Sequence, residues 1–239
     1  MRFKYIFLLV VLVVLAGCHR GAVLPDSSSK ARGVYHTVQK GQTLWRICRT
    51  YKVNMQDVAE LNNITDHSQI KAGDRLFIPG ATKKLWVAAA AKPPGSSKTP
   101  TKPVPEPPAP VIKKNTGLFI WPLIGPITSR FGIHGGQKHD GIDIKGKPGA
   151  AVKASRSGKV VFSDWLDGYD NTVIIEHADS FVTVYSKLDI ITVANGQKVK
   201  QSQTLGRLAT APAKKCSLHF QVRRYRKARN PLFYLPEAR

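Results

Sequence analysis

The spacing of apolar residues divides this chain into segments of different kinds. An unbroken apolar run over residues 6–15 follows a short start that carries Arg2 and Lys4. The run is too short for an ordinary membrane-spanning helix and has the length of the hydrophobic part of a secretory signal peptide. It ends in Leu-Ala-Gly-Cys at 15–18, after which residues 19–33 form a short polar tether. The start of the chain therefore predicts export.

Residues 34–80 alternate between strand-like and helical spacing. Thr43 can cap a helix that runs to Tyr51 and turns Leu44 inward. The other predicted elements are a strand at 36–38, a second helix at 53–61 that ends at Asn62, and a strand at 75–79. The pattern predicts a small β-α-α-β unit.

Residues 81–117 have the composition of a linker. Eight of the sixteen prolines lie between Pro93 and Pro110, separated by Lys, Ser, Thr and Ala. Such a composition buries too little apolar surface to fold and favours extended geometry. We expect a spacer that holds two modules at separate places.

From residue 118 to 239 the apolar residues form short runs rich in β-branched and aromatic side chains. The runs lie at 160–162, 172–175, 181–185 and 218–222, and Gly, Asn and Asp separate them. This punctuation predicts an antiparallel all-β domain.

The net charge of +22 would by itself suggest a nucleic-acid partner. Export removes that expectation, because an exported protein meets anionic lipid, lipopolysaccharide and cell wall instead. Basic side chains gather near the C-terminus, where Arg223, Arg224, Arg226, Lys227 and Arg229 occur within seven residues.

Candidate metal chemistry lies in the last domain. His139 and Asp143 are four residues apart in Lys-His-Asp-Gly-Ile-Asp-Ile, and Ser217 and His219 alternate in Ser-Leu-His-Phe. Two imidazoles and one carboxylate are a normal donor set for a zinc ion with an open fourth position.

These motifs resemble the LytM-type zinc peptidases of the bacterial cell wall. The resemblance runs over 118–239 and includes Ser-Arg-Phe-Gly at 129–132 and His-Asp-Gly-Ile-Asp at 139–143. It implies His139, Asp143 and His219 as metal ligands. The family also has two proton-handling histidines, and the matching positions here are Lys187 and Ser217. The resemblance thus implies a degenerate peptidase domain, and it leaves open whether zinc is still bound in a structural or vestigial role.

Residues 34–80 resemble the LysM module, which binds N-acetylglucosamine polymers. The resemblance implies a peptidoglycan partner and a binding contribution from Thr43, Leu44, Asn62 and Ile70. The start of the chain resembles a bacterial lipobox, which makes residues 1–18 the signal and Cys18 the lipidated residue. His19 after it favours the periplasmic face of the outer membrane. The whole order resembles the NlpD-type murein hydrolase activator lipoproteins.

Three functions are compatible with these features. In the first, the chain binds peptidoglycan and activates an N-acetylmuramoyl-alanine amidase during wall remodelling or daughter-cell separation, without catalysis of its own. In the second, it is an active zinc-dependent peptidoglycan endopeptidase. That requires a proton acceptor, and an ordinary lysine, with a pKa of about 10.4, is protonated at neutral pH. In the third, the basic residues tether the envelope to anionic polymers.

Overall fold

We describe the protein from a computed structural model, which covers residues 30–89, 110–210 and 216–237. The apolar run, the lipobox with Cys18 and most of the polar tether lie outside the described residues. Within the described ranges, no helix combines the length and apolar character needed to cross a membrane.

The first unit has the β-α-α-β order that the sequence predicts. It contains β1 (Gly33–Thr37), α1 (Leu44–Tyr51), α2 (Met55–Leu61), the 3-10 helix η1 (His67–Gln69) and β2 (Arg75–Pro79). Both helices begin where a side chain can accept a backbone N–H, because Thr43 caps α1 and Asn54 caps α2. The two strands pair antiparallel, with Val34 opposite Ile78. The apolar faces of α1 and α2 form the core of this unit.

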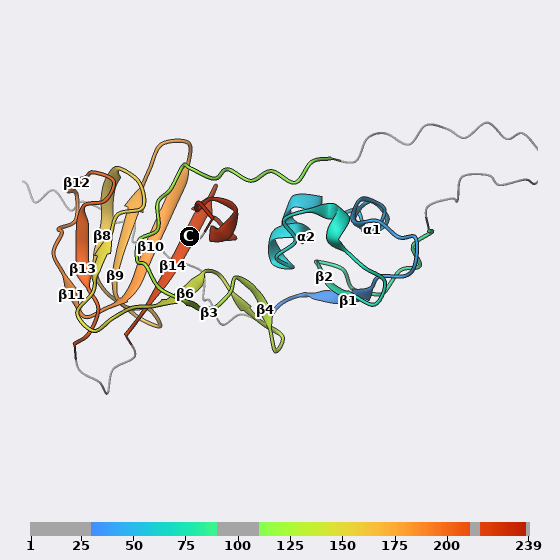
Figure 1. Ribbon diagram of the computed structural model, residues 1–239, viewed down its shortest axis with the longest axis horizontal. Coiled ribbons are helices and arrows are strands. Elements are labelled where there is room, and N and C mark those ends of the chain that lie inside the picture. Colours follow the sequence, from blue (N-terminus) through green and yellow to red (C-terminus); the bar gives the residue numbers. More distant parts are fainter. Residues whose placement is uncertain (1–29, 90–109, 211–215, 238–239) are drawn as a thin grey trace, which may run out of the picture.

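The second unit is the antiparallel all-β domain that the sequence predicts. Its strands are β3 (Ile127–Ser129), β4 (Gly132–His134), β5 (Gln137–His139), β6 (Ile142–Lys145), β7 (Ala151–Lys153), β8 (Gly158–Leu166), β9 (Asp170–Glu176), β10 (Phe181–Leu188), β11 (Ile190–Ile191), β12 (Lys198–Val199), β13 (Thr204–Arg207), β14 (Ser217–Arg224) and β15 (Lys227–Arg229). A 3-10 helix, η2 (Pro231–Phe233), follows them. The main sheet has the order β12-β8-β9-β10-β14-β6-β3, with β15 on β14. A small sheet, β11-β13-β7, and the β4–β5 hairpin complete the unit (Figure 1).

Large side chains on the central strands form the core of this domain. Tyr185 on β10 and Phe220 on β14 are fully buried, and their ring centroids lie 5.4 Å apart. Tyr185 also accepts the backbone N–H of Ser155 at 2.8 Å. These contacts fix β10 and β14 in the core, and these two strands carry the candidate site together with β5 and β6.

The two units contact each other through α2. Glu60 is 2% exposed, and its carboxylate accepts hydrogen bonds from Arg229 Nη2 at 2.6 Å and from the backbone N–H of Asn230 at 3.0 Å. Asp57, one turn earlier, pairs with Arg229 at 2.7 Å and with Lys227. Because one helix supplies both carboxylates and one short segment supplies both cations, the contact has a defined orientation.

The N-terminal edge of the second unit reinforces this contact. Ala31 N donates to Gly136 O in the turn of the β4–β5 hairpin at 3.0 Å, and Asn63 Nδ2 donates to Phe131 O at 3.0 Å. Figure 1 shows the hairpin extending toward β1. At Gly132 a Cβ would lie 2.6 Å from Leu61 O, so only glycine permits this approach.

The described ends of the linker pack against folded parts of the chain. Val87 is buried and its carbonyl accepts from Gln42 Nε2 at 2.7 Å, while Ile112 is 7% exposed. Lys113 is bonded through its backbone N–H and C=O to the Gln56 amide. The expectation of a spacer that keeps the modules apart is thus corrected, because the chain returns at residue 110 to a surface that both units share.

Candidate functional site

Strands β6 and β14, with the end of β5, bring the predicted metal ligands together. Asp143 on β6 lies directly opposite His219 on β14, and His219 lies opposite Ser186 on β10. His139 closes the group from the end of β5. The potential ligand atoms of His139, Asp143 and His219 all lie within 4.8 Å of one another. The pairing of β6 with β14 therefore joins residues that are 76 positions apart in the sequence.

The charge state of the cluster suits metal ligation. Burial and, to a smaller extent, the nearby His219 together lower the pKa of His139 to about 4, so this imidazole is neutral at neutral pH. Burial by itself would raise the pKa of Asp143, but the hydrogen bond from His219 and the surrounding positive charges lower it to about 2. His139 Nε2 is a buried nitrogen with no hydrogen-bond partner among the described residues. An unused imidazole lone pair beside a carboxylate fits a zinc ion.

Other contacts hold the same side chains as a hydrogen-bonded cluster. His219 Nδ1 lies 2.7 Å from Asp143 Oδ1, which is shorter than the separation of about 3.3 Å between two ligand atoms on one tetrahedral zinc. His219 Nε2 lies 3.0 Å from Gln221 Nε2, and Gln221 Oε1 accepts from Arg223 Nη1 at 3.0 Å. Because Arg223 fixes the orientation of the Gln221 amide, His219 accepts at Nε2 and carries its proton on Nδ1. The donor set fits zinc, and binding would require His219 to give up that proton.

Lys187 supplies the positive charge of this cluster. Its Nζ lies 3.3 Å from Asp143 Oδ2, and its side chain is 39% exposed. The residue has a left-handed backbone with φ of 65°, at an irregularity in the pairing of β9 with β10 between Tyr185 and Leu188. This bend directs Lys187 toward Asp143, whereas Ser186 before it is buried and accepts from Thr172.

Lys187 and Ser217, the positions that the resemblance matches to the family's proton-handling histidines, both lie beside this cluster. Ser217 is half-buried, opposite Lys145 at the start of β14, and two residues from His219. On one strand, residues two apart share a face. Lys187 and Ser217 therefore border the cluster from β10 and β14.

Two further histidines lie outside the group of potential ligands. His177 is 7% exposed, with its ring nitrogens 2.9 Å from Ser157 O and 2.7 Å from Thr183 Oγ1. His134 lies on β4 with its Nε2 2.7 Å from Arg130 O, and its ring centroid is 6.2 Å from that of His139. His134 thus flanks the cluster without joining it.

The residues predicted to bind sugar have different surroundings. Asn62 and Ile70 border a hollow of about 310 Å³ next to β2. The Asn62 side chain also bonds Val58 O and both backbone polar groups of Phe77, so it fastens α2 to β2. Thr43 caps α1, and Leu44 is fully buried. Sugar binding by these residues stays a prediction, and burial leaves Leu44 only an indirect contribution through the core.

Sequence reasoning did not anticipate the other side chains at the hollow. Asn63, Gln69, Asp74 and Arg75 also line it. The polar loop 62–70 was a signal for Asn63 and Gln69, since a loop next to a half-buried Ile70 exposes its neighbours.

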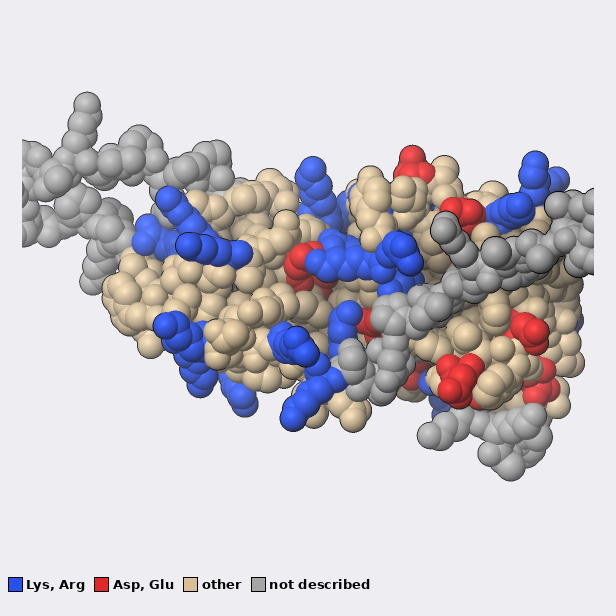
Figure 2. Space-filling model, turned by 180° about the vertical axis from the view of Figure 1, so that it is seen from behind, with Lys and Arg blue, Asp and Glu red and all other residues tan. Residues whose placement is uncertain are grey.

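Four of the five basic side chains near the C-terminus, those of Arg223, Arg224, Lys227 and Arg229, have partners within the protein. Arg223 is 4% exposed and lies 3.7 Å from Asp140 Oδ2, while Lys227 and Arg229 pair with α2. Arg224 stacks over the rings of Phe181 and Tyr225, at 4.9 and 5.3 Å. Figure 2 shows Lys and Arg side chains scattered over one face rather than gathered in a single patch. Internal ion pairs thus neutralise part of the positive charge that these residues carry.

Comparison with known proteins defines the class. Residues 36–79 match the LysM domain model and residues 137–231 match the model of peptidase family M23. The chain is 34% identical to the uncharacterized lipoprotein YgeR of Escherichia coli strain K12, over 97% of this chain and 92% of that protein. The chain therefore belongs to the LysM-containing, M23 peptidase-like proteins.

Within this class the relatives are lipoproteins of the NlpD type. The lipoprotein NlpD/LppB homolog of Pseudomonas aeruginosa is 29% identical over 84% of this chain and 76% of its own. The murein hydrolase activator NlpD of Escherichia coli K12 is 38% identical, over 49% of this chain and 31% of its own length.

Proposed function

We propose that this protein is an outer-membrane lipoprotein that binds peptidoglycan and activates a murein amidase without cleaving the wall itself. The observation that carries the proposal is the ion pair of Lys187 with Asp143. Where peptide hydrolysis needs a group that accepts the proton of water, this site presents an ammonium already bound to a carboxylate. Ser217 offers an uncharged hydroxyl at the second position. The names of the NlpD relatives support activation of a murein hydrolase, and the LysM match supports the wall as partner.

Activation requires the protein to bind the open form of an amidase more tightly than the closed form. A hundredfold shift needs about 2.7 kcal/mol of such preference. The surface bordered by Lys187, Ser217 and His134 is the proposed contact. Zinc, if bound by His139, Asp143 and His219, would have a structural or vestigial role here.

The test combines purified peptidoglycan with residues 19–239, alone and with an autoinhibited N-acetylmuramoyl-alanine amidase. We expect no release of wall fragments by the chain alone and at least a tenfold increase in amidase activity. Lys187→Glu should remove most of this increase, whereas Lys159→Glu, at an exposed position on β8, should not. Chelator-sensitive cleavage of stem peptides by the chain alone would instead establish the endopeptidase.

The retained triad with its unpaired His139 Nε2 favours that endopeptidase as the second candidate. The double substitution Lys187→His and Ser217→His tests whether the two missing histidines are all that the site lacks for endopeptidase activity. We expect weak, zinc-dependent endopeptidase activity in the double variant and none in either single variant, because both proton-handling positions are needed. An anionic tether is the third candidate, and amidase activation that survives in high salt would argue against it.

A further inference from the structure

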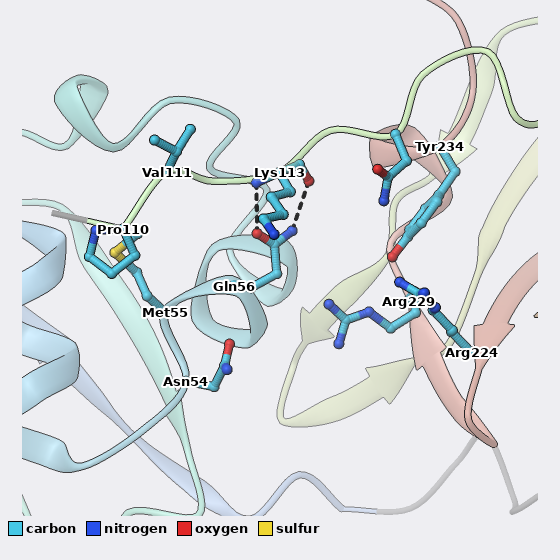
Figure 3. A pocket seen from close by; sticks show the side chains of 10 residues that line it. Asn54, Met55, Gln56, Pro110, Val111, Lys113, Arg224, Arg229 and Tyr234 are labelled. Atoms are coloured by element: carbon cyan, nitrogen blue, oxygen red, sulfur yellow. Dashed lines mark hydrogen bonds between the residues drawn. The ribbon is translucent and has the colours of Figure 1, made fainter. Parts of the chain in front are cut away.

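The contact between the two units encloses a pocket that neither unit forms alone. Its volume is about 260 Å³. The start of α2 contributes Met55 and Gln56, the end of the linker contributes Val111, and the all-β domain contributes Arg224 and Tyr234. Figure 3 shows Met55, Pro110 and Val111 on one side and Arg224, Arg229 and Tyr234 on the other. The pocket thus has an apolar wall that faces a cationic wall.

The charges around the pocket do not cancel. Arg229 is bonded to Asp57 and Glu60, and Lys227 also pairs with Asp57, so two cations and two carboxylates balance. Arg224 has no carboxylate partner among the described residues; its guanidinium is held by stacking on Phe181 and Tyr225. Its Nε is a buried donor without an acceptor in the described structure. A guanidinium fixed by stacking, with donors left over, suits a planar carboxylate.

The apolar and amide side chains of the pocket indicate which other groups the ligand contains. Met55 is a flexible apolar residue, and Val111 is 76% exposed at the rim. The Gln56 amide is used by the backbone of Lys113 and by Glu60, and Asn54 Oδ1 caps α2. Asn54 Nδ2 and the side chain of Asn115 are left for the ligand's own amide groups. A small aliphatic side chain, a peptide bond and a terminal carboxylate match these surroundings.

We call the pocket between the two units the seam pocket. We propose that it binds the carboxylate end of a short peptide with small aliphatic side chains, as in uncrosslinked peptidoglycan stems. The inference extends the proposed wall binding from the glycan to the peptide and is independent of amidase activation. A ligand that needs both walls would also stabilise the docked arrangement of the two units.

Titration of residues 19–239 with D-alanyl-D-alanine, followed by NMR, tests the proposal. We expect saturable shifts around the pocket and at least tenfold weaker binding of the C-terminal amide of the same dipeptide. Arg224→Gln should weaken binding at least tenfold, while Arg226→Gln, two residues away on the exposed turn and outside the pocket, should leave it unchanged. Equal binding of acid and amide, or equal losses in the two variants, would overturn the proposal.

Two further variants guard against misfolding and test the seam. Val111→Trp fills the pocket from an exposed position and should abolish binding without lowering thermal stability. Asp57→Arg does not touch the pocket, yet it should abolish binding because it separates the walls. Retained dipeptide binding in Asp57→Arg would show that the site is not composite and would contradict the inference.

Displacement of the dipeptide by equimolar inorganic phosphate would also contradict the inference, since the site would then accept any anion. Binding to chitin oligomers reports separately on the LysM glycan site. The failure of peptide binding can therefore be told apart from a failure of glycan binding.

Discussion

Glu60 in the LysM module and Arg229 in the peptidase-like domain are joined by a 2.6 Å hydrogen bond, although 169 positions separate them in the sequence. Glu60 is buried and has a second partner in Asn230, so its charge is compensated only while the modules are docked. Breaking a buried pair by removing one partner typically costs about 3–5 kcal/mol, because a charge is left uncompensated.

We therefore expect Glu60→Gln to favour separation of the two units. Arg229 keeps Asp57 as a partner, so the cost falls to about 2 kcal/mol. Small-angle scattering should show a larger radius of gyration, and each unit should still melt cooperatively. Glu237→Gln makes the same chemical change at an exposed position and should change neither quantity. An unchanged radius in Glu60→Gln would mean that the apolar contacts alone hold the units together.

Lys187 should compete with a metal ion for Asp143. Coulomb attraction at 3.3 Å is discounted by the 39% exposure of the lysine, which leaves about 1–2 kcal/mol. Lys187→Ala should accordingly bind zinc about tenfold more tightly than the wild type in calorimetric titration. His139→Ala, which removes a ligand, should abolish binding, and Lys159→Ala should leave the affinity unchanged. Equal zinc affinity with and without Lys187 would refute the competition.

His177 should make the peptidase-like domain sensitive to acid. Burial lowers the pKa of His177 from its usual 6.5 to about 4, so the folded state holds the neutral imidazole. The stabilising contribution is complete above pH 6.5 and is lost as the pH falls from 6.5 toward 4, because the unfolded chain takes up a proton first. The full difference corresponds to about 3 kcal/mol.

Urea unfolding at pH 7.5, 5.5 and 4.5 measures this contribution. His177→Gln should reduce the loss of stability between pH 6.5 and 4 without removing it, because His139 has a similarly lowered pKa, and this holds even if the variant is less stable throughout. His67→Gln, at an exposed position on η1, is the matched control and should keep the wild-type slope. A slope shared by all three proteins would assign the acid sensitivity to other groups.

Cys18→Ser should abolish lipidation and leave an unprocessed precursor, since the lipobox offers one thiol for acylation. Metabolic labelling with palmitate measures this directly. Label that still enters the variant would refute the lipobox interpretation and the anchoring that depends on it.

The sequence by itself determined the local structure and the chemistry that each segment could offer. Thr43 and the strand at 75–79 were predicted because caps and short β-branched runs act through near neighbours. The motif around His139 and Asp143, with His219, indicated a zinc-type donor set, and the family resemblance implied, as a prediction, that Lys187 and Ser217 replace proton-handling histidines. The caps and strands need only residue types and spacings within one segment, whereas the grouping of His219 with His139 and Asp143 rested on the family resemblance.

Only the tertiary structure decided how those segments face one another. Sequence spacing could not indicate that Gln221 and Arg223 fix the proton of His219, or that Lys187 bends toward Asp143 at a strand irregularity. It also could not place Glu60 against Arg229. That contact joins the two units, so the end of the linker packs against both of them and the pocket between the units forms. Such contacts depend on the register and packing of elements far apart in the chain. Side-chain pairing across them follows from the folded geometry, which no local pattern of residues encodes.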